Sequence, residues 1–239
     1  MKLDILAFAS HPDDVELGCA GTIISHIRQG KKVGVADITQ GELGTRGTPE
    51  IRAQESEAAS KLLGLHVRVN LGLADGFFRS EKDQLLAAVK VVRQFKPEIV
   101  IANAVHDRHP DHGRGSAFAS EACFLAGLKQ VKTTDETEQE QEAWRPKAVY
   151  HYIQDRYIQP DFVVDITDYW EEKLETIKAF KSQFYDPQNT TPNTYISDPN
   201  FLKFVEARAR EMGHAIGVVF GEGFTKERQL GVRNLFDLI

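Results

Sequence analysis

The sequence predicts a three-layer α/β/α protein, in which a mostly parallel sheet is covered by helices on both faces. Strand-like and helix-like segments alternate four times in the first half of the chain, and the segments between them are of ordinary loop length. The strands are short, nearly continuous apolar runs, as is typical of strands buried on both faces. No internal repeat or long Pro/Gly/Ser-rich linker divides the 239 residues. We therefore expect one domain, 1–239.

The first four strands are predicted at residues 3–9, 32–39, 67–73 and 98–104. Apolar residues at helical spacing predict helices over residues 15–29, 50–63, 82–95 and 113–131. Gly30 ends the first of these helices, and Thr48-Pro49 gives the second an N-cap and a first-turn proline.

The second half of the chain is less regular. The acidic stretch 133–142 is predicted to be a solvated loop or helix extension. Two more strands are predicted at residues 148–153 and 162–166, followed by helices at 170–184 and 201–212. Proline and asparagine in the stretch 186–193 predict an irregular loop between those helices.

Composition excludes several classes of function. The net charge of −6 and the pI near 5.8 make the chain a poor binder of a phosphate backbone, so we expect no nucleic-acid partner. No apolar run approaches the roughly 18 residues of a membrane span, and the first residues lack a long apolar signal segment. Cys19 and Cys123 both fall in predicted helices and are interpreted as core residues. A cytoplasmic protein is expected.

Polar residues gather where two of the predicted strands end. The segment His11-Pro12-Asp13-Asp14 follows the first strand, and His106-Asp107-Arg108-His109-Pro110-Asp111-His112 follows the fourth. Both contain His-Pro-Asp in that order, and the second holds three of the chain's eight histidines. Because ligands of open α/β sheets bind beyond the carboxyl ends of the strands, these two segments are the candidate site.

Residue type and spacing predict a metal site there. Imidazole nitrogen and carboxylate oxygen are good ligands for Zn²⁺, and a catalytic zinc takes three protein ligands and leaves one position open. His11 and Asp14 lie three residues apart around a turn that Pro12 stiffens, so both can face one crevice, and His112 would complete the set. Asp13 is then free to act as a general base.

The remaining candidates each have a structural alternative. His109 and Asp111 are interpreted as a pair beside the substrate, in which a carboxylate orients a histidine. A single histidine, however, is more commonly structural, and an aspartate at a strand end is often a helix N-cap. Arg52 would bind the substrate or form a surface salt bridge, and Asp75 is either a site residue or a turn residue before Gly76. Since G-x-G-x-x-G does not follow the first strand, a dinucleotide site is not predicted. Two polar residues near a later strand end, His151 and Gln154, are within reach of the site.

These two segments resemble the PIG-L/LmbE family of zinc-dependent N-acetylglucosamine deacetylases. The similarity rests on Ser10-His11-Pro12-Asp13-Asp14 together with His109-Pro110-Asp111-His112, and it extends over most of the chain. Further segments are similar to the branch that deacetylates N-acetyl-α-D-glucosaminyl L-malate in bacillithiol biosynthesis, namely 47–52, 106–113, 159–166, 181–184 and 222–224. The resemblance implies a single LmbE-like domain with a Rossmann-like fold.

The resemblance also implies a role for each candidate. The implied metal ligands are His11, Asp14 and His112, for Zn²⁺ or another divalent ion such as Fe²⁺. Asp13 would be the general base, and His109 would stabilise the tetrahedral intermediate while Asp111 orients it. The implied sugar contacts are Arg52 and Asp75, and Arg108 would meet the malate carboxylates.

The substrate implied by the resemblance is thus a small N-acetylglucosaminyl compound, and a homo-oligomer such as a hexamer is expected. Two alternatives stay open. One is a deacetylase of the same fold that acts on another N-acetylglucosamine-containing substrate. The more distant one is a non-catalytic α/β protein that binds a sugar or a metal.

Overall fold

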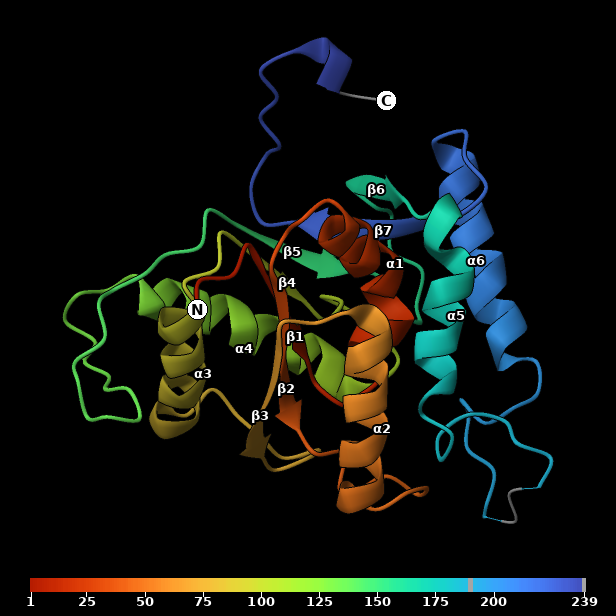
Figure 1. The fold of residues 1–239 in the computed structure, drawn as a ribbon, viewed down its shortest axis with the longest axis horizontal. Coiled ribbons are helices and arrows are strands. Elements are labelled where there is room, and N and C mark those ends of the chain that lie inside the picture. The colour runs from red at the N-terminus through yellow and green to blue at the C-terminus, as the bar shows by residue number, and fades with distance from the viewer. Residues whose placement is uncertain (189–190, 238–239) are drawn as a thin grey trace.

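Within residues 1–188 and 191–237, which the computed structural model describes, seven strands form one sheet (Figure 1). Their order across the sheet is β3-β2-β1-β4-β5-β7-β6. In chain order they are β1 Ile5–Ala9, β2 Val33–Thr39, β3 Val67–Leu73, β4 Ile99–Ala102, β5 Ala148–Tyr152, β6 Phe162–Asp165 and β7 Gly221–Lys226.

The strand order contains a switch point between β1 and β4. The strands β1 to β5 all pair in parallel, and Ala7 of β1 lies opposite Val35 of β2 on one side and Ile101 of β4 on the other. The chain first adds strands on one side of β1 and then returns to its other side. The loops after β1 and β4 therefore diverge and leave a crevice at the carboxyl edge of the sheet.

Helices cover both faces of the sheet, as predicted (Figure 1). Alternate residues of β1 point to opposite faces: Leu6 and Phe8 belong to the core under α3 and α4, whereas Ile5 and Ala7 belong to the core under α1. The α-helices are α1 Asp14–Arg28, α2 Pro49–Leu63, α3 Lys82–Phe95, α4 Pro110–Ala126, α5 Trp170–Lys178 and α6 Phe201–Ala215, and short 3₁₀ turns occupy Thr167–Tyr169 and Leu235–Asp237. The mostly parallel single-domain α/β fold is confirmed.

One strand was not predicted. β7 has the sequence GEGFTK, whose two glycines give it little intrinsic tendency to form a strand. It forms because it lies between two partners, pairing antiparallel with β5 and with β6. This strand is the exception to the parallel sheet, and it brings residues 221–226 under α1.

Several boundaries also differ from the prediction. α4 begins at Pro110 rather than 113, because proline suits the first helical position and the His109 side chain accepts the Asp111 N–H as an N-cap. It ends at Ala126 before Gly127 rather than at 131. The helix predicted to reach 184 ends at Lys178, where Phe180 N–H bonds the Ile177 carbonyl and the chain turns.

Two predicted loops are irregular. The acidic stretch 133–142 is mostly exposed and contains one isolated bridge, between Thr134 and Glu140. The predicted loop 186–193 contains no regular element where it is described; Asn189 and Thr190 lie outside the described residues.

Helix α1 is kinked, and a buried ion pair caps the kink. Cys19 has non-helical dihedral angles (φ −149°, ψ 20°), so the amides that follow lose their helical acceptors. The Glu222 carboxylate of β7 accepts the N–H groups of Gly21 and Thr22 at 3.0 and 2.7 Å. Lys173 of α5 donates to Glu222 at 2.6 Å and to the Leu17 carbonyl at 2.8 Å. The pair thereby holds the first turns of α1 against the sheet.

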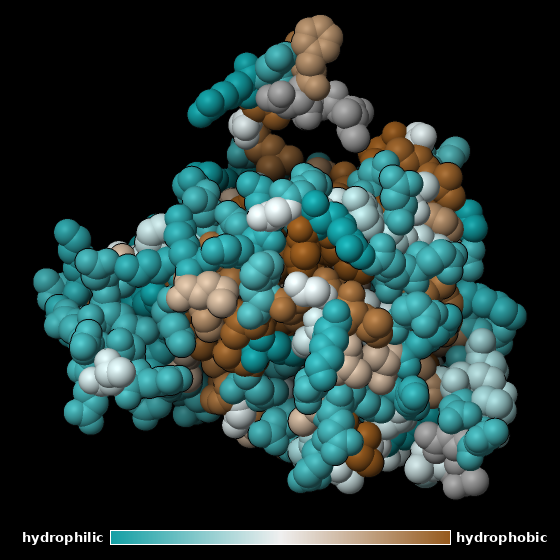
Figure 2. Space-filling model, in the orientation of Figure 1, coloured by the Kyte–Doolittle hydropathy of each residue, from teal (hydrophilic) through white to brown (hydrophobic). Residues whose placement is uncertain are grey.

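The surface is mostly hydrophilic on the face shown in Figure 2. The C-terminal segment extends away from the body of the molecule, where Leu235 and Phe236 are 79% and 91% exposed (Figure 1). Of the helices in the described residues, none is long and apolar enough to cross a membrane.

Candidate active site

The turn after β1 places two carboxylates in different directions. His11 and Pro12 follow the buried strand directly, and Asp13 then takes a positive φ of 115° before α1 begins at Asp14. A positive φ is strained for a residue with a side chain, and such strain is common at functional sites. The turn directs the carboxylate of Asp14 to the His11 backbone N–H (2.9 Å), while that of Asp13 reaches Arg52.

The turn after β4 brings two histidines to the same crevice. His109 is the N-cap of α4, and His112 lies one turn into the helix, so the two rings stack with centroids 5.2 Å apart. The His11 ring packs edge-on against His109 at 4.6 Å and lies 5.7 Å from His112. The switch point of the sheet therefore joins residues that are about a hundred positions apart in the chain.

The Asp14 carboxylate lies between two of these rings. One oxygen, Oδ1, is 3.1 Å from His112 Nε2, and the other, Oδ2, is 3.5 Å from His11 Nδ1. Burial would raise the pKa of Asp14, but His112 and His11 hold that pKa well below its usual range. Burial also lowers the pKa of His112, and Asp14 and Asp107 outweigh it and raise that pKa to about 9. Asp14 is therefore held in its ionised form, and its charge together with that of Asp107 favours the protonated form of His112.

Outer partners orient the predicted metal ligands. His112 Nδ1 lies 2.6 Å from Asp107 Oδ2, which directs Nε2 toward Asp14. Asn103 Nδ2 donates to Asp14 at 3.0 Å, and Gln154 Nε2 donates to its other oxygen at 2.8 Å. A carboxylate behind a histidine ligand is the usual outer shell of a zinc site.

The donor set fits a divalent ion. Two groups of side chains have ligand atoms within 4.8 Å of one another, His11 with His109 and His112, and His11 with Asp75 and Asp111. His11 belongs to both groups, and Asp14 lies next to two members of the first group, His11 and His112. Buried nitrogen and carboxylate donors, with sulfur ligands excluded because Cys19 and Cys123 lie in the core, suit a hydrolytic zinc. The ligand set His11, Asp14 and His112 is brought together and stays a prediction.

Asp13 is buried beside the cluster without joining it. Its carboxylate accepts from Arg52 Nη2 at 3.0 Å, and the same nitrogen donates to the Pro12 carbonyl. Burial raises the pKa of Asp13 to about 7, although the Arg52 charge opposes that rise. A buried carboxylate with a pKa in this range has the properties of a general base.

Asp111 does not orient His109 as the resemblance implied. Only its backbone N–H reaches the His109 ring, at 3.3 Å from Nδ1. Its carboxylate instead accepts the Gly76 N–H (2.8 Å), approaches His11 Nε2 (3.3 Å) and pairs with Arg114. The reason is that Asp111 is already inside α4, so its side chain points back along the helix toward β1. With Nδ1 accepting, His109 can donate from Nε2.

The three residues predicted to contact the substrate differ in how strongly other residues already hold them and in how exposed they are. Asp75 is held by His11 (3.0 Å) and by the Leu43 N–H (3.0 Å). Arg52 is buried against Asp13, and its Nε atom has no hydrogen-bond partner in the described part of the chain. Arg108 is the most exposed of the three, with its side chain 41% exposed, 3.6 Å from Asp155 and stacked over the Tyr195 ring at 4.2 Å.

A cavity of about 410 Å³, which we name the outer cavity, joins these residues. Its volume falls in the range of small-molecule sites. Its rim includes Thr194 and Tyr195 from the loop after α5, and the buried Arg46 holds that loop by donating to the Phe184 and Pro192 carbonyls. Predicted site residues that line it are His11, Asp13, Asp14, Arg52, Asp75, Arg108, His109 and His112.

Three polar residues were given no role by the sequence reasoning. Asp107 orients His112, and Asn103 connects Asp14 to Ser10 at the end of β1. Arg114 anchors Asp111. Asn103 had a detectable signal, since it is a polar residue at the end of an apolar strand. Asp107 and Arg114 had none beyond their closeness to the histidine cluster.

Comparison with known proteins places both turns in a known family. A family model described as PIG-L, GlcNAc-PI de-N-acetylase, matches residues 6–123, which include both turns. The chain is 27% identical over 200 residues to a probable N-acetyl-alpha-D-glucosaminyl L-malate deacetylase 2 of Bacillus subtilis, covering 77% of this chain and 84% of that protein. It is also 33% identical over 114 residues to the uncharacterized deacetylase YaiS of Escherichia coli, a match that spans 45% of this chain and 61% of the relative.

Solved structures share the whole fold. The conserved protein TT1542 of Thermus thermophilus is 34% identical with a TM-score of 0.84, and the superposition covers 97% of this chain and 98% of that one. The N,N'-diacetylchitobiose deacetylase of Pyrococcus horikoshii is 27% identical with a TM-score of 0.80, covering 98% and 88%.

Proposed function

This chain belongs to the PIG-L family, and we propose that it is a metal-dependent hydrolase that removes the acetyl group of N-acetyl-α-D-glucosaminyl L-malate. Two relatives are named as deacetylases, one of N-acetyl-alpha-D-glucosaminyl L-malate and one of N,N'-diacetylchitobiose, whereas another is named a 4-oxalmesaconate hydratase. The B. subtilis relative supports the malate glycoside as the substrate.

One observation carries the hydrolase: Asp13 is buried next to the His11–Asp14–His112 cluster but is held apart from it. Simple metal or sugar binding does not require an additional buried carboxylate whose backbone is strained. A general base does require one, placed within reach of a water at the cluster. The Arg52 guanidinium, 3.0 Å away, fixes the direction of the carboxylate.

Each residue of the site has a separate role in the proposed hydrolysis. A zinc ion held by His11, Asp14 and His112 would polarise the amide carbonyl and acidify a water. Asp13 takes the proton of that water as it attacks the carbonyl carbon. His109, whose Nδ1 accepts the Asp111 N–H, has Nε2 free to donate to the oxygen on which negative charge develops. The C–N bond then breaks, and the amine leaves after it receives a proton.

The malate group is assigned to the side of the outer cavity where Arg108 stands. Its guanidinium is exposed at the cavity, and a charged donor suits a carboxylate. Arg52 and Asp75 remain the proposed sugar contacts. Because Arg52 already bonds Asp13 and Asp75 already bonds His11, each would contact the substrate only through the polar atoms that these bonds do not use.

An amine-release assay tests the proposal. We expect the protein to deacetylate N-acetylglucosaminyl malate, and we expect a chelator to abolish the reaction and added Zn²⁺ to restore it. No amine release from any N-acetylglucosaminide in the presence of Zn²⁺ would reject the deacetylase.

A second candidate substrate is diacetylchitobiose, because the Pyrococcus horikoshii relative is a deacetylase of that compound. Arg108→Ala separates the two. It should raise KM for the malate glycoside by about tenfold to a hundredfold, the worth of a charged hydrogen bond, and leave diacetylchitobiose hydrolysis unchanged. Arg28→Ala, which removes an exposed arginine paired with Glu172, is the matched control and should change neither KM.

The setting of the enzyme is also part of the proposal. Both cysteines are buried and unpaired with each other, which supports a reducing, cytoplasmic location. A homo-oligomer such as a hexamer remains an expectation, and sedimentation measurements would test it.

A further inference from the structure

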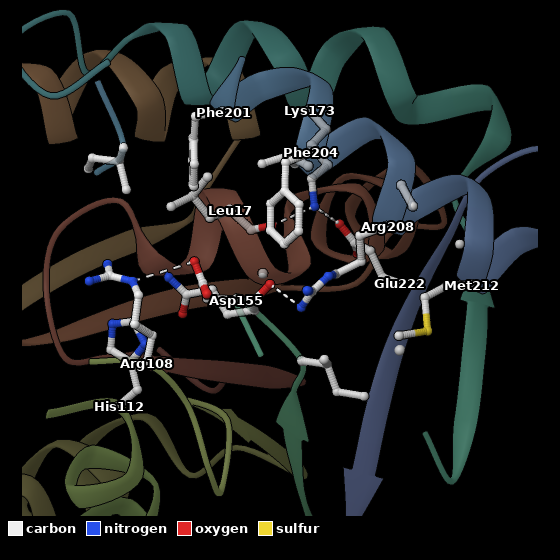
Figure 3. Close-up of a pocket in the computed structure, with 18 residues that line it drawn as sticks. Leu17, Arg108, His112, Asp155, Lys173, Phe201, Phe204, Arg208, Met212 and Glu222 are labelled. Atoms are coloured by element: carbon white, nitrogen blue, oxygen red, sulfur yellow. Dashed lines mark hydrogen bonds and ion pairs between the residues drawn. The ribbon is translucent and has the colours of Figure 1, made fainter. Parts of the chain in front are cut away.

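A second cavity adjoins the outer cavity, and Figure 3 shows the residues that line it. This inner cavity has a volume of about 50 Å³ and is formed by α1, α6 and β7. The two cavities share one wall, to which Leu17, Arg108, His112, Gln154 and Ile196 contribute. The inner cavity therefore borders the histidine cluster at His112, and neither Arg52 nor Asp75 lines it.

The inner cavity presents mainly carbon atoms to a ligand. At its wall, Lys173 pairs with Glu222 at 2.6 Å, and Arg108 lies with Nε 3.6 Å from the Asp155 carboxylate (Figure 3). Arg208 donates to the Gln154 carbonyl at 2.7 Å. The remaining wall is made of apolar side chains, among them Leu17, Ile196, Phe201, Phe204 and Val205.

One polar atom at the shared wall is unused. Gln154 donates from Nε2 to Asp14 at 2.8 Å, and because Asp14 is a carboxylate that can only accept, this bond fixes the orientation of the amide. The other end of the amide, Oε1, is buried and has no hydrogen-bond partner in the part of the chain that the structure describes. A buried acceptor without a partner is costly, so a donor from the substrate would stabilise it.

We propose that the inner cavity receives the acyl group of the substrate and that Gln154 Oε1 accepts the N–H of the scissile amide. This inference rests on the proposed deacetylase function. In a planar trans amide the N–H points away from the carbonyl oxygen, on the same side as the acyl chain. A substrate whose carbonyl faces the His11–Asp14–His112 cluster and whose N–H reaches Gln154 therefore directs its acyl chain toward the inner cavity.

Size assigns the two cavities to the two halves of the substrate. The outer cavity, at about 410 Å³, has the volume of an ordinary small-molecule site. The inner cavity, at about 50 Å³, is only a few times larger than the roughly 10–15 Å³ that one water molecule needs. The inner cavity can hold an acetyl group or a slightly longer chain but no sugar ring. In the reaction, water adds to the acyl carbon, the C–N bond breaks, the nitrogen gains a proton, and a short carboxylate remains in this cavity.

Chain-length selectivity tests the acyl assignment. We would measure kcat/KM for the acetyl, butyryl, hexanoyl and octanoyl forms of one N-acylglucosaminide. Wild type should hydrolyse the octanoyl form at least a hundredfold less efficiently than the acetyl form, because each extra methylene in a filled pocket costs about tenfold or more. Equal efficiency along the whole series would overturn the assignment.

Two variants of α6 change the cavity in opposite directions. Phe204→Ala opens its wall and should raise the hexanoyl-to-acetyl ratio of kcat/KM at least tenfold. Val205→Phe fills it and should lower the butyryl-to-acetyl ratio by a similar factor. Phe124→Ala, an exposed phenylalanine of α4 that lines neither cavity, is the matched control. If both folded α6 variants keep the wild-type ratios, the inner cavity does not hold the acyl chain.

An ester substrate tests Gln154 separately. An analogue acetylated through oxygen in place of the C2 nitrogen has no N–H to donate. Gln154→Met should lower kcat/KM for the amide about tenfold more than for this ester, whereas a loss of support for Asp14 would affect both alike. Equal losses would reduce Gln154 to a positioning residue. Failure of wild type to cleave any N-acylglucosaminide would instead reject the deacetylase itself.

Discussion

The turns after β1 and β4 contain the same tripeptide, His-Pro-Asp, yet they place it differently. In the first turn the tripeptide precedes the helix, and Asp13 adopts a positive φ just before α1 begins. In the second turn α4 begins at the proline itself, so Asp111 is already helical. The equivalent aspartates therefore have different partners: Asp13 pairs with Arg52, and the carboxylate of Asp111 lies 3.3 Å from His11 Nε2.

This difference shows that the backbone conformation of each turn, rather than the shared tripeptide, decides where the aspartate side chain points and therefore which role it can take. The first turn contributes a ligand candidate and a separate base from neighbouring residues, because the positive φ at Asp13 turns the two carboxylates apart. The second turn contributes two stacked histidines, because His109 and His112 lie one helical turn apart. Substitutions can test each half of this assignment.

The largest effect is expected at the two aspartates. Asp13→Asn should lower kcat by about 10²- to 10⁴-fold, the usual worth of a general base, while metal content stays at the wild-type level. Asp111→Asn should cost less, since its carboxylate supports His11 and takes no proton. Steady-state kinetics with metal analysis measure both, and near-normal turnover of Asp13→Asn would remove the general base.

The two helices differ in how they are supported. Glu222 and Lys173 cap the kink of α1, and α4 has no such pair in the described residues. Glu222→Ala leaves a buried lysine unpaired and should lower the free energy of unfolding by about 3–5 kcal/mol, as measured by urea denaturation. Glu172→Gln, in the exposed pair with Arg28, should cost at most about 1 kcal/mol. Equal small losses would mean that the kink does not depend on the pair.

A smaller effect, on metal affinity, is expected from substitution of Asp107, the carboxylate that bonds His112. Asp107→Ala should weaken metal binding by about 10- to 100-fold, because the carboxylate no longer orients the imidazole. Competition with a chromophoric chelator measures the affinity. Asp161→Ala, which removes an aspartate that pairs with Lys226, is the control and should leave the affinity unchanged. Unchanged affinity in Asp107→Ala would contradict the orienting role.

Each of the two helices also contains one buried cysteine, Cys19 in α1 and Cys123 in α4. Burial raises the pKa of both thiols, so the native state keeps protons that the unfolded chain releases above pH about 8.5. Stability must then fall as pH rises, by up to about 1.4 kcal/mol per pH unit for each thiol. Between pH 8 and 10, the free energy of unfolding measured with urea should fall less steeply with pH in Cys123→Ala than in wild type. An identical slope would exclude this contribution.

Local sequence pattern was sufficient to predict much of the fold and to pick out residues that the structure brings together around the outer cavity. The helix at 82–95 and the strand at 67–73 have the predicted bounds, because apolar periodicity and chain-stopping residues act over a few positions. β7 was missed because two neighbouring strands, rather than its own glycine-rich sequence, stabilise it. Gln154 was noticed only as near the site, since its bond to Asp14 spans 140 positions of the chain.

The sequence by itself determined the alternation of strands and helices and the clustering of histidine and aspartate at two strand ends. Only the tertiary structure decided that β1 and β4 are neighbours, that Asp111 supports His11 instead of His109, and that α6 closes a small apolar cavity behind His112. The physical reason is distance along the chain. Helix and strand periodicities are set by near neighbours, whereas side-chain direction at a site is set by hydrogen bonds and packing between segments that meet only after folding.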